Sequence, residues 1–181
     1  MNALKEWATV VTALERGEQT VILRKGGILE TESGFKIEAK KFLLFPTFEH
    51  QGEKNLKQRF RNYLDVIKQN HPQIGHNKIT SYAEVMDEAD IKSHEKIRAL
   101  SDFHIWSDSY IDERVNWMPE KPIKAVFLKV YKIPEKEIPI KSEYHGCKSW
   151  ININEDIQLG NPVLSDEDLF SRLQKFKEIV N

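Results

Sequence analysis

The chain has 181 residues, of which 40% are hydrophobic and 30% are charged, and its formal net charge is −1. This length and apolar content predict a single domain over residues 1–181 that can bury its own core. The near-neutral charge excludes a chain that is basic throughout, so an electrostatic site for an anion must be a local patch.

Cys147 is the single cysteine of the sequence. It can form no internal disulfide, and no zinc site can be built on pairs of cysteines. The N-terminal segment lacks the layout of a signal peptide, and no apolar run reaches the roughly 18 residues that a membrane helix needs. We therefore expect a soluble cytoplasmic protein with no membrane partner and no resident cofactor, and the oligomeric state stays open.

The first part of the chain predicts a helix followed by a β-meander. Asn2–Arg16 carries apolar residues at helical spacing, and Gly17 is suited to end the helix. Thr20–Arg24 is rich in β-branched residues, and the Gly26-Gly27 pair favours a hairpin turn after it. Three further strands are expected, over Ile28–Thr31, Phe35–Lys40 and Phe42–Phe45.

The middle of the chain contains the clearest predicted helix, Glu53–Asn70. One face of this helix is apolar, and its other faces are mainly basic, with Lys54, Lys57, Arg59, Arg61 and Lys68. The segment Ile79–Ile91 is ambiguous, because it begins like a strand and then becomes acidic.

The second half of the chain predicts two short helices, two strands and a final helix. The expected elements are helices in Ser93–Leu100 and Phe103–Pro119, strands at Pro122–Tyr131 and Cys147–Ile153, and a last helix capped by Ser165. The last helix is predicted to bury Leu169, Phe170, Leu173, Phe176 and Val180. Together the elements predict an α+β fold with flanking helices, whose antiparallel sheet is either strongly curved or barrel-like, the second form being PUA-like.

Several strings occur in a specific order: LKEWA, LRKGGI, FLLFPTFEHQ, FHIWSDSYIDERVNWMPEKP, VFLKVYKIP and YHGCKSW. In these strings the chain resembles a bacterial family known as domain of unknown function 1802, over roughly Leu4 to Trp150. The resemblance implies no activity. It marks motif positions without giving them roles: Arg24, Lys25, Gly26, Gly27, Pro46, Thr47, His50, Gln51, Trp106, Trp117, Gly146, Cys147, Ser149 and Trp150.

The first functional hypothesis is an anion site. Arg24 and Lys25 enter the Gly26-Gly27 turn, where backbone N–H groups can point into a concavity. The helix predicted from Glu53 begins just after His50 and Gln51, and a helix N-terminus favours negative charge. If these parts meet, the site binds phosphate. The alternative interpretation is an ordinary hairpin with solvated cations.

The second hypothesis extends the anion site to nucleic acid. A basic helix face can follow a phosphate backbone, and exposed aromatic side chains can stack bases. Our leading prediction is therefore binding of a phosphate-bearing ligand, nucleic acid or a nucleotide. The alternative is a solvated helix face with aromatic residues in the core. The predicted ligand-binding residues are Arg24, Lys25, Gly26, Gly27, His50, Gln51, Arg59, Arg61, Trp106, Arg114, Trp117 and Trp150.

A third hypothesis is a metal-dependent nuclease. Glu38 and Lys40 fall on one face of a predicted strand, and Glu30 lies on the preceding one. This arrangement resembles the PD-(D/E)xK nucleases, in which carboxylates hold Mg²⁺ and the lysine assists the attacking water. Mg²⁺ is expected as a cofactor only under this alternative.

A fourth hypothesis is nucleophilic catalysis by Cys147, whose thiolate Lys148 would favour. His145 points to the other side of a strand, so the base would be His50 or His104. None of the histidines pairs at metal-ligand spacing, and we predict no resident metal site. A protein-interaction module without catalysis is the remaining alternative.

Overall fold

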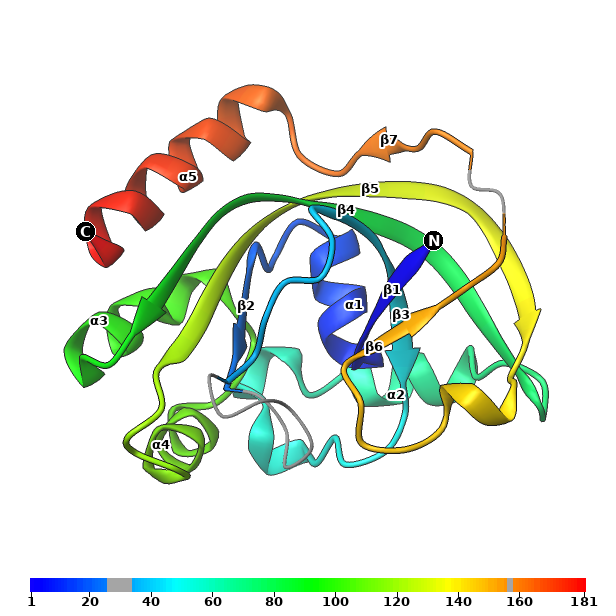
Figure 1. The fold of residues 1–181 in the computed structure, drawn as a ribbon, viewed down its shortest axis with the longest axis horizontal. Coiled ribbons are helices and arrows are strands. Elements are labelled where there is room, and N and C mark those ends of the chain that lie inside the picture. Colours follow the sequence, from blue (N-terminus) through cyan, green and yellow to red (C-terminus); the bar gives the residue numbers. More distant parts are fainter. Residues whose placement is uncertain (26–33, 156–157) are drawn as a thin grey trace.

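The computed structural model describes residues 1–25, 34–155 and 158–181, and these form a mixed α+β fold (Figure 1). Seven strands make one sheet, with the bounds β1 Asn2–Trp7, β2 Val21–Arg24, β3 Lys41–Thr47, β4 His76–Ile91, β5 Ile123–Pro139, β6 Trp150–Asn152 and β7 Asn161–Pro162. The α-helices of the described residues are α1 Ala8–Glu15, α2 Tyr63–Gln69, α3 His94–Ala99, α4 Asp108–Asn116 and α5 Asp166–Val180. Short 3-10 turns η1 to η4 lie at Glu53–Asn55, Gln58–Phe60, Leu100–Phe103 and Ser142–Tyr144.

The sheet is open, with the strand order β2-β5-β4-β3-β1-β6 and with β7 paired to β5. It is not closed into a barrel, so the barrel-like option was wrong. The β1–β3 pair is parallel and the other pairs are antiparallel. The long strands β4 and β5 curve over α1 (Figure 1). Register shifts between Ile79 and Ser81 and between Val85 and Asp87 fit this curvature, because a bulge bends a strand.

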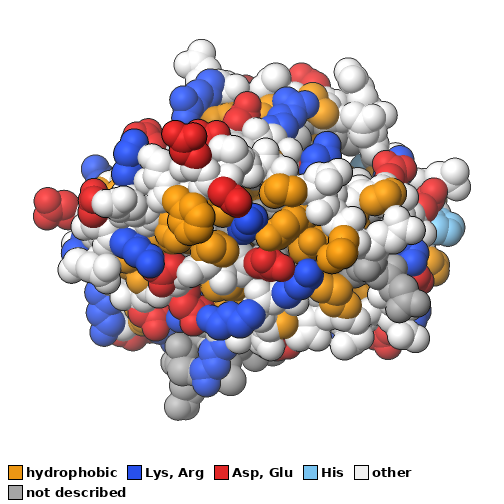
Figure 2. Space-filling model, turned by 90° about the horizontal axis from the view of Figure 1, so that it is seen from above, with side chains coloured by type: hydrophobic (Ala, Val, Ile, Leu, Met, Phe, Trp, Pro, Cys, Tyr) orange, Lys and Arg blue, Asp and Glu red, His pale blue; other side chains and the backbone are white. Residues whose placement is uncertain are grey.

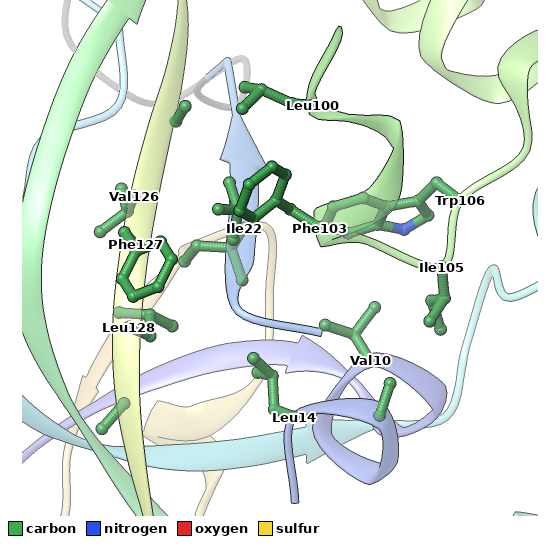
Figure 3. Close-up of a cluster of buried hydrophobic side chains, with 14 of the residues drawn as sticks. Val10, Leu14, Ile22, Leu100, Phe103, Ile105, Trp106, Val126, Phe127 and Leu128 are labelled. Atoms are coloured by element: carbon green, nitrogen blue, oxygen red, sulfur yellow. The ribbon is translucent and has the colours of Figure 1, made fainter. Parts of the chain in front are cut away.

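Two hydrophobic clusters lie on the two faces of the sheet. Along β1 and β3, consecutive residues belong to different clusters, because neighbouring side chains of a strand point to opposite faces. Leu4 and Leu44 belong to the first cluster, and Ala3 and Leu43 belong to the second. The first cluster is the main core (Figure 3) and joins the helices to the sheet through side chains such as Leu14, Ile22, Phe103 and Phe127. The second is smaller and is completed by the segment around η4 and β6.

The N-terminal segment differs from its prediction. Residues Asn2–Trp7 form a strand between β3 and β6, and the helix begins only at Ala8. The helical spacing of Leu4, Trp7, Val11 and Leu14 was real, yet several residues between them are also buried. Pairing with two neighbouring strands satisfies this backbone on both sides, and that tertiary context overrides the local pattern.

The predicted long basic helix, Glu53–Asn70, is wrong as a continuous element. The segment forms η1, η2 and then α2. Leu56 has an extended backbone conformation and makes a β-bridge with Trp106, and Lys57 after it is not helical either. The chain gives up helical hydrogen bonds here because the buried Leu56 docks against another segment.

The predicted meander is partly outside the described residues, as Gly26, Gly27 and Ile28–Thr31 are not described. Phe35–Lys40 forms no strand, while Phe42–Phe45 lies within β3 as expected. Ile79–Ile91 belongs to the strand β4. The serine caps of α3 and α5 are confirmed at Ser93 and Ser165, but Phe170 of α5 is 59% exposed and was wrongly assigned to the core. No helix in the described part of the chain has the length and apolar character to cross a membrane.

Candidate functional site

The side chain of Arg24 connects the two ends of the open sheet. Arg24 ends β2, the first strand of the order, and its Nη2 donates to Ser149 Oγ at 2.6 Å, directly before the last strand β6. Its Nη1 lies 3.2 Å from Glu6 Oε2 on β1. The guanidinium carbon lies 5.0 Å from the ring centre of Phe35. One cation therefore joins segments that are separated by most of the chain.

Glu6, the partner of Arg24, is also fixed in position by its contacts. Its side chain is 5% exposed, and its Oε1 accepts a hydrogen bond from the backbone N–H of Trp7 at 2.9 Å. Glu6 faces the main-core side of β1 because it lies two residues after Leu4, and such residues share one face of a strand. A carboxylate this buried requires a cation, and Arg24 supplies it.

Aromatic rings border this ion pair. Trp7 follows Glu6 directly, and its ring centre lies 5.1 Å from that of Tyr110 on α4. Burial raises the pKa of Tyr110, while the neighbouring guanidiniums of Arg114 and Arg24 oppose the shift. Trp7 and Tyr110 are both only partly buried. We call Glu6, Trp7, Arg24, Tyr110 and Ser149 the Arg24 cluster.

Lys25, the neighbour of Arg24 in the sequence, takes a different position. Its side chain is buried, and its ammonium donates to the carbonyls of Val115 at 2.7 Å and Arg114 at 3.1 Å. These carbonyls end α4, so Lys25 caps the C-terminal end of that helix. Burial lowers the pKa of Lys25, with Arg114 as a second cause. Its ammonium is directed into the protein, away from any ligand at the surface.

Beside Arg24 lies a small cavity of about 10 Å³ that Lys25, Trp106, Tyr110 and Arg114 help to line. This is about the volume that one water molecule needs. Trp106 is buried, and its Nε1 has no hydrogen-bond partner among the described residues. The cavity has room for about one water molecule and is too small for a nucleobase.

The other predicted stacking residues lie apart from one another. Trp150 is buried, stacks on Phe35 at 6.0 Å and donates from Nε1 to Lys36 O. Trp117 is partly exposed and lies under the guanidinium of Arg114 at 4.9 Å. Trp106 and Trp150 therefore present no open ring face, and Trp117 is available only beside Arg114.

His50 and Gln51 do not join Arg24. Gln51 Oε1 accepts from the backbone N–H of Thr9 at 3.0 Å and from its hydroxyl at 2.9 Å, which caps the N-terminus of α1. His50 is exposed and 3.9 Å from the carboxylate of Glu49. The amide of Gln51 thus occupies the place where an anion would meet this helix end.

The basic residues of the segment 53–70 are dispersed. Lys57 donates to the carbonyls of Ser101 and His104, and burial lowers its pKa. Arg61 pairs with Glu53 at 3.5 Å, and Arg59 packs over the ring of Phe60 at 4.7 Å. No described interaction links Arg59 or Arg61 to Arg24. The face seen from above the sheet also mixes acidic and basic side chains, with apolar ones between them (Figure 2).

The residues of the nuclease hypothesis do not form the expected constellation. Glu38 and Lys40 lie on no strand, and Lys40 is 3.4 Å from Glu88. Glu30 is outside the described residues. Among the residues that the structure describes, no group of three or more His, Cys, Asp or Glu could hold a metal ion.

The thiol of Cys147 is exposed, but the two candidate bases lie elsewhere. His104 is buried, and burial, followed by the charge of Lys57, lowers its pKa to about 3. Its Nδ1 has no partner among the described residues. His50 contacts Glu49 instead. The described contacts thus join neither histidine to the thiol.

Sequence reasoning missed Glu6 and Trp7 as site residues and gave Ser149 no role. The visible signal was a carboxylate followed by tryptophan in LKEW, and a hydroxyl before tryptophan in KSW. Their convergence depends on the parallel and antiparallel pairing of β1, which local patterns do not show.

The fold and this site define an α+β protein whose open sheet is bridged at its two ends by an arginine. The chain belongs to the family described as domain of unknown function (DUF1802), whose model matches residues 3–175. No curated protein matches the chain.

Among solved structures, the chain is similar to ASCH from Zymomonas mobilis. A tyrosine-to-phenylalanine mutant of that protein is 12% identical with a TM-score of 0.42, over 75% of this chain and 73% of the other. A serine-to-alanine mutant is 11% identical with a TM-score of 0.38, over 70% and 66%. ASCH itself is 12% identical with a TM-score of 0.36, over 78% and 88%. A likeness of this size assigns neither a site nor an activity.

Proposed function

We propose that the protein binds a phosphate-bearing ligand, a nucleotide or single-stranded nucleic acid, at the Arg24 cluster. The observation that carries the proposal is the position of Arg24, which is fixed by Glu6 and Ser149 and yet 19% exposed beside two partly exposed aromatic rings. A guanidinium that is already held in place loses little freedom when it binds an anion.

Arg24 retains donors for a ligand. A guanidinium carries five N–H groups. The described hydrogen bonds go from Nη1 to Lys5 O and Glu6, and from Nη2 to Ser149. Within the described contacts, the Nε–H and one Nη2–H stay available for phosphate oxygens. The Ser149 hydroxyl accepts from Arg24, so its own hydrogen can be donated to the same ligand.

The charges near the cluster are of both signs. Glu6 is neutralised by Arg24, and Arg114 lies near Tyr110 on α4 as a second guanidinium, with Glu113 as a second carboxylate. Lys5 faces the other side of β1, where its ammonium donates to the carbonyls of Tyr144 and Gly146. Binding of a phosphate at the cluster therefore depends on the directed donors of Arg24 and on Arg114, and not on a net positive charge.

Trp7 and Tyr110 give the proposed site its aromatic part. Stacking of a base on such a ring contributes about 1–3 kcal/mol and is tolerant of sequence. The small cavity beside Arg24 excludes a buried base. The base would therefore stack from outside, on the exposed side of the Trp7–Tyr110 pair. The PUA-like character that the sequence predicts for the fold stays a proposal.

The test is fluorescence anisotropy with a labelled oligouridylate and the matching oligodeoxythymidylate. We expect saturable binding that weakens with salt, with a log–log slope of about −1.4 if two phosphates are contacted. Arg114→Gln is expected to lower the affinity at least fivefold. Arg98→Gln is the matched control, because Arg98 loses the same charge in an exposed pair with Asp112.

The proposal fails if the oligonucleotides do not bind at low salt, or if Arg98→Gln weakens binding as much as Arg114→Gln. A Trp7→Leu variant separates the aromatic part from the electrostatic part. It is expected to weaken binding while leaving the salt slope unchanged.

A further inference from the structure

The second face of the sheet contains two adjoining hollows that the proposed function does not use. One has a volume of about 220 Å³ and an apolar lining that includes Leu43, Ile79, Ile138 and Ile153. The other, of about 380 Å³, lies over Tyr82 and Lys41. They adjoin because Glu155 and Gln158 line both.

The hollows exist because few side chains cover the second hydrophobic cluster. None of the described α-helices contributes a side chain to this cluster, which the segment around η4 and β6 completes instead. The register shift between Ile79 and Ser81 also lies at this point of the β4–β5 pair. The larger hollow reaches the size that is typical of a site for a small organic molecule, and the smaller one beside it supplies a mainly apolar lining.

The charged side chains around the hollows are already paired. Lys41 lies 3.3 Å from Glu84, and Lys136 lies 2.5 Å from Glu155. Glu135 lies 3.0 Å from Lys78. The N-terminal ammonium of Met1, which also lines the larger hollow, donates to Ile153 O at 2.5 Å. A charged group on a ligand would compete with these existing partners, and it would lose its hydration next to the apolar side chains of the smaller hollow.

The uncharged polar groups lie at one end of the lining. Asn154 and Gln158 offer amide donors and acceptors beside the larger hollow. The opposite end has isoleucine and leucine side chains. We infer that the second face binds a small uncharged molecule whose body is apolar or aromatic and whose hydrogen-bonding group faces Asn154 and Gln158.

Two fluorescent probes test the inference, because they share one ring system and differ in charge. N-phenyl-1-naphthylamine is neutral, and 1-anilinonaphthalene-8-sulfonate carries a sulfonate. We expect saturable fluorescence enhancement with the neutral probe and at least tenfold weaker binding of the sulfonate. Equal binding of both probes would overturn the assignment of an uncharged ligand, and no saturable signal with the neutral probe would overturn the site.

Two variants locate the binding. Ile79→Phe extends a side chain into the smaller hollow and is expected to weaken binding of the neutral probe at least fivefold. Ile74→Phe makes the same substitution at a fully exposed position and is expected to leave binding of the probe unchanged. If both variants bind like the wild type, the probe is elsewhere and the inference is wrong.

A second measurement does not depend on any variant. In protein labelled at the isoleucine δ1-methyl groups, the neutral probe is expected to shift the signals of Ile79, Ile133 and Ile138. The signals of Ile22 and Ile105, which are in the main core, are expected to stay in place. Shifts confined to the main core would contradict the inference. The test leaves the Arg24 cluster intact, so it is independent of the proposed nucleic-acid site.

Discussion

Arg24 and Lys25 are consecutive cations whose surroundings differ completely. Arg24 pairs with a carboxylate and a hydroxyl and keeps part of its surface exposed. Lys25 is buried against two carbonyls at the end of α4. The comparison shows that a pair of basic residues is not one electrostatic feature. Where the strand ends, one side chain joins a partly open site and the other completes the interior.

The largest expected effect is the loss of the bridge between the sheet ends. Arg24→Met leaves the carboxylate of Glu6 buried without a cation, and we expect unfolding to become easier by about 3 kcal/mol. Urea denaturation measures this. Adding Glu6→Gln to Arg24→Met removes the uncompensated charge and is expected to restore part of the loss. Equal stability of Arg24→Met and the wild type would show that the bridge contributes little.

Lys25→Met tests the other half of the comparison. The substitution keeps the apolar stem but leaves the carbonyls of Arg114 and Val115 without their donor. The expected cost is about 2 kcal/mol, the range for hydrogen bonds to a charged group. Oligonucleotide affinity per folded molecule should change less than twofold. A large loss of affinity with unchanged stability would mean that Lys25 belongs to the ligand site.

His104 is a second buried group whose pKa is lowered by burial, as that of Lys25 is. Its pKa is about 3 in the folded protein, because of burial and Lys57, and 6.5 is the ordinary value. Between these values the unfolded chain binds a proton that the folded protein does not. Stability is therefore lost as the pH falls below 6.5, by at most about 1.4 kcal/mol per unit from this group.

A His104→Gln variant should show a flatter dependence of unfolding free energy on pH between the folded and unfolded pKa values of that histidine. Denaturation curves at several pH values measure both proteins. Identical slopes for the variant and the wild type would exclude His104 as the source.

The smallest effect is expected at Arg61, whose side chain is exposed and paired with Glu53. Arg61→Ala should change the free energy of unfolding by less than about 0.5 kcal/mol. Its effect on oligonucleotide binding should be much smaller than that of Arg114→Gln. A loss of affinity matching that of Arg114→Gln would move the interface to the segment 53–70.

The sequence predicted those parts of the fold that depend on local signals. The serine caps before α3 and α5, the apolar run in β3 and the strand at the start of β5 all have such signals. It failed where the partner is distant. The strand β1 exists because β3 and β6 lie on either side of it. The helix expected over Glu53–Asn70 is interrupted because Leu56 docks beside Trp106.

The candidate site was only partly predictable for the same reason. Arg24 and Arg114 were proposed as ligand residues from their type, and the structure places both near Tyr110. Which cation has an internal partner depends on groups far away in the sequence, such as Ser149 for Arg24 and the end of α4 for Lys25. Residue type alone does not contain this information.

The most direct test follows the Arg24 side chain itself. In ¹H–¹⁵N spectra, the Nε–H signal of Arg24 and the indole signal of Trp7 are expected to shift together as oligouridylate is added, and to saturate at one dissociation constant. The Nε–H signals of Arg59 and Arg61 should stay in place. Shifts of Arg59 and Arg61 while Arg24 and Trp7 stay unchanged would contradict the proposed site.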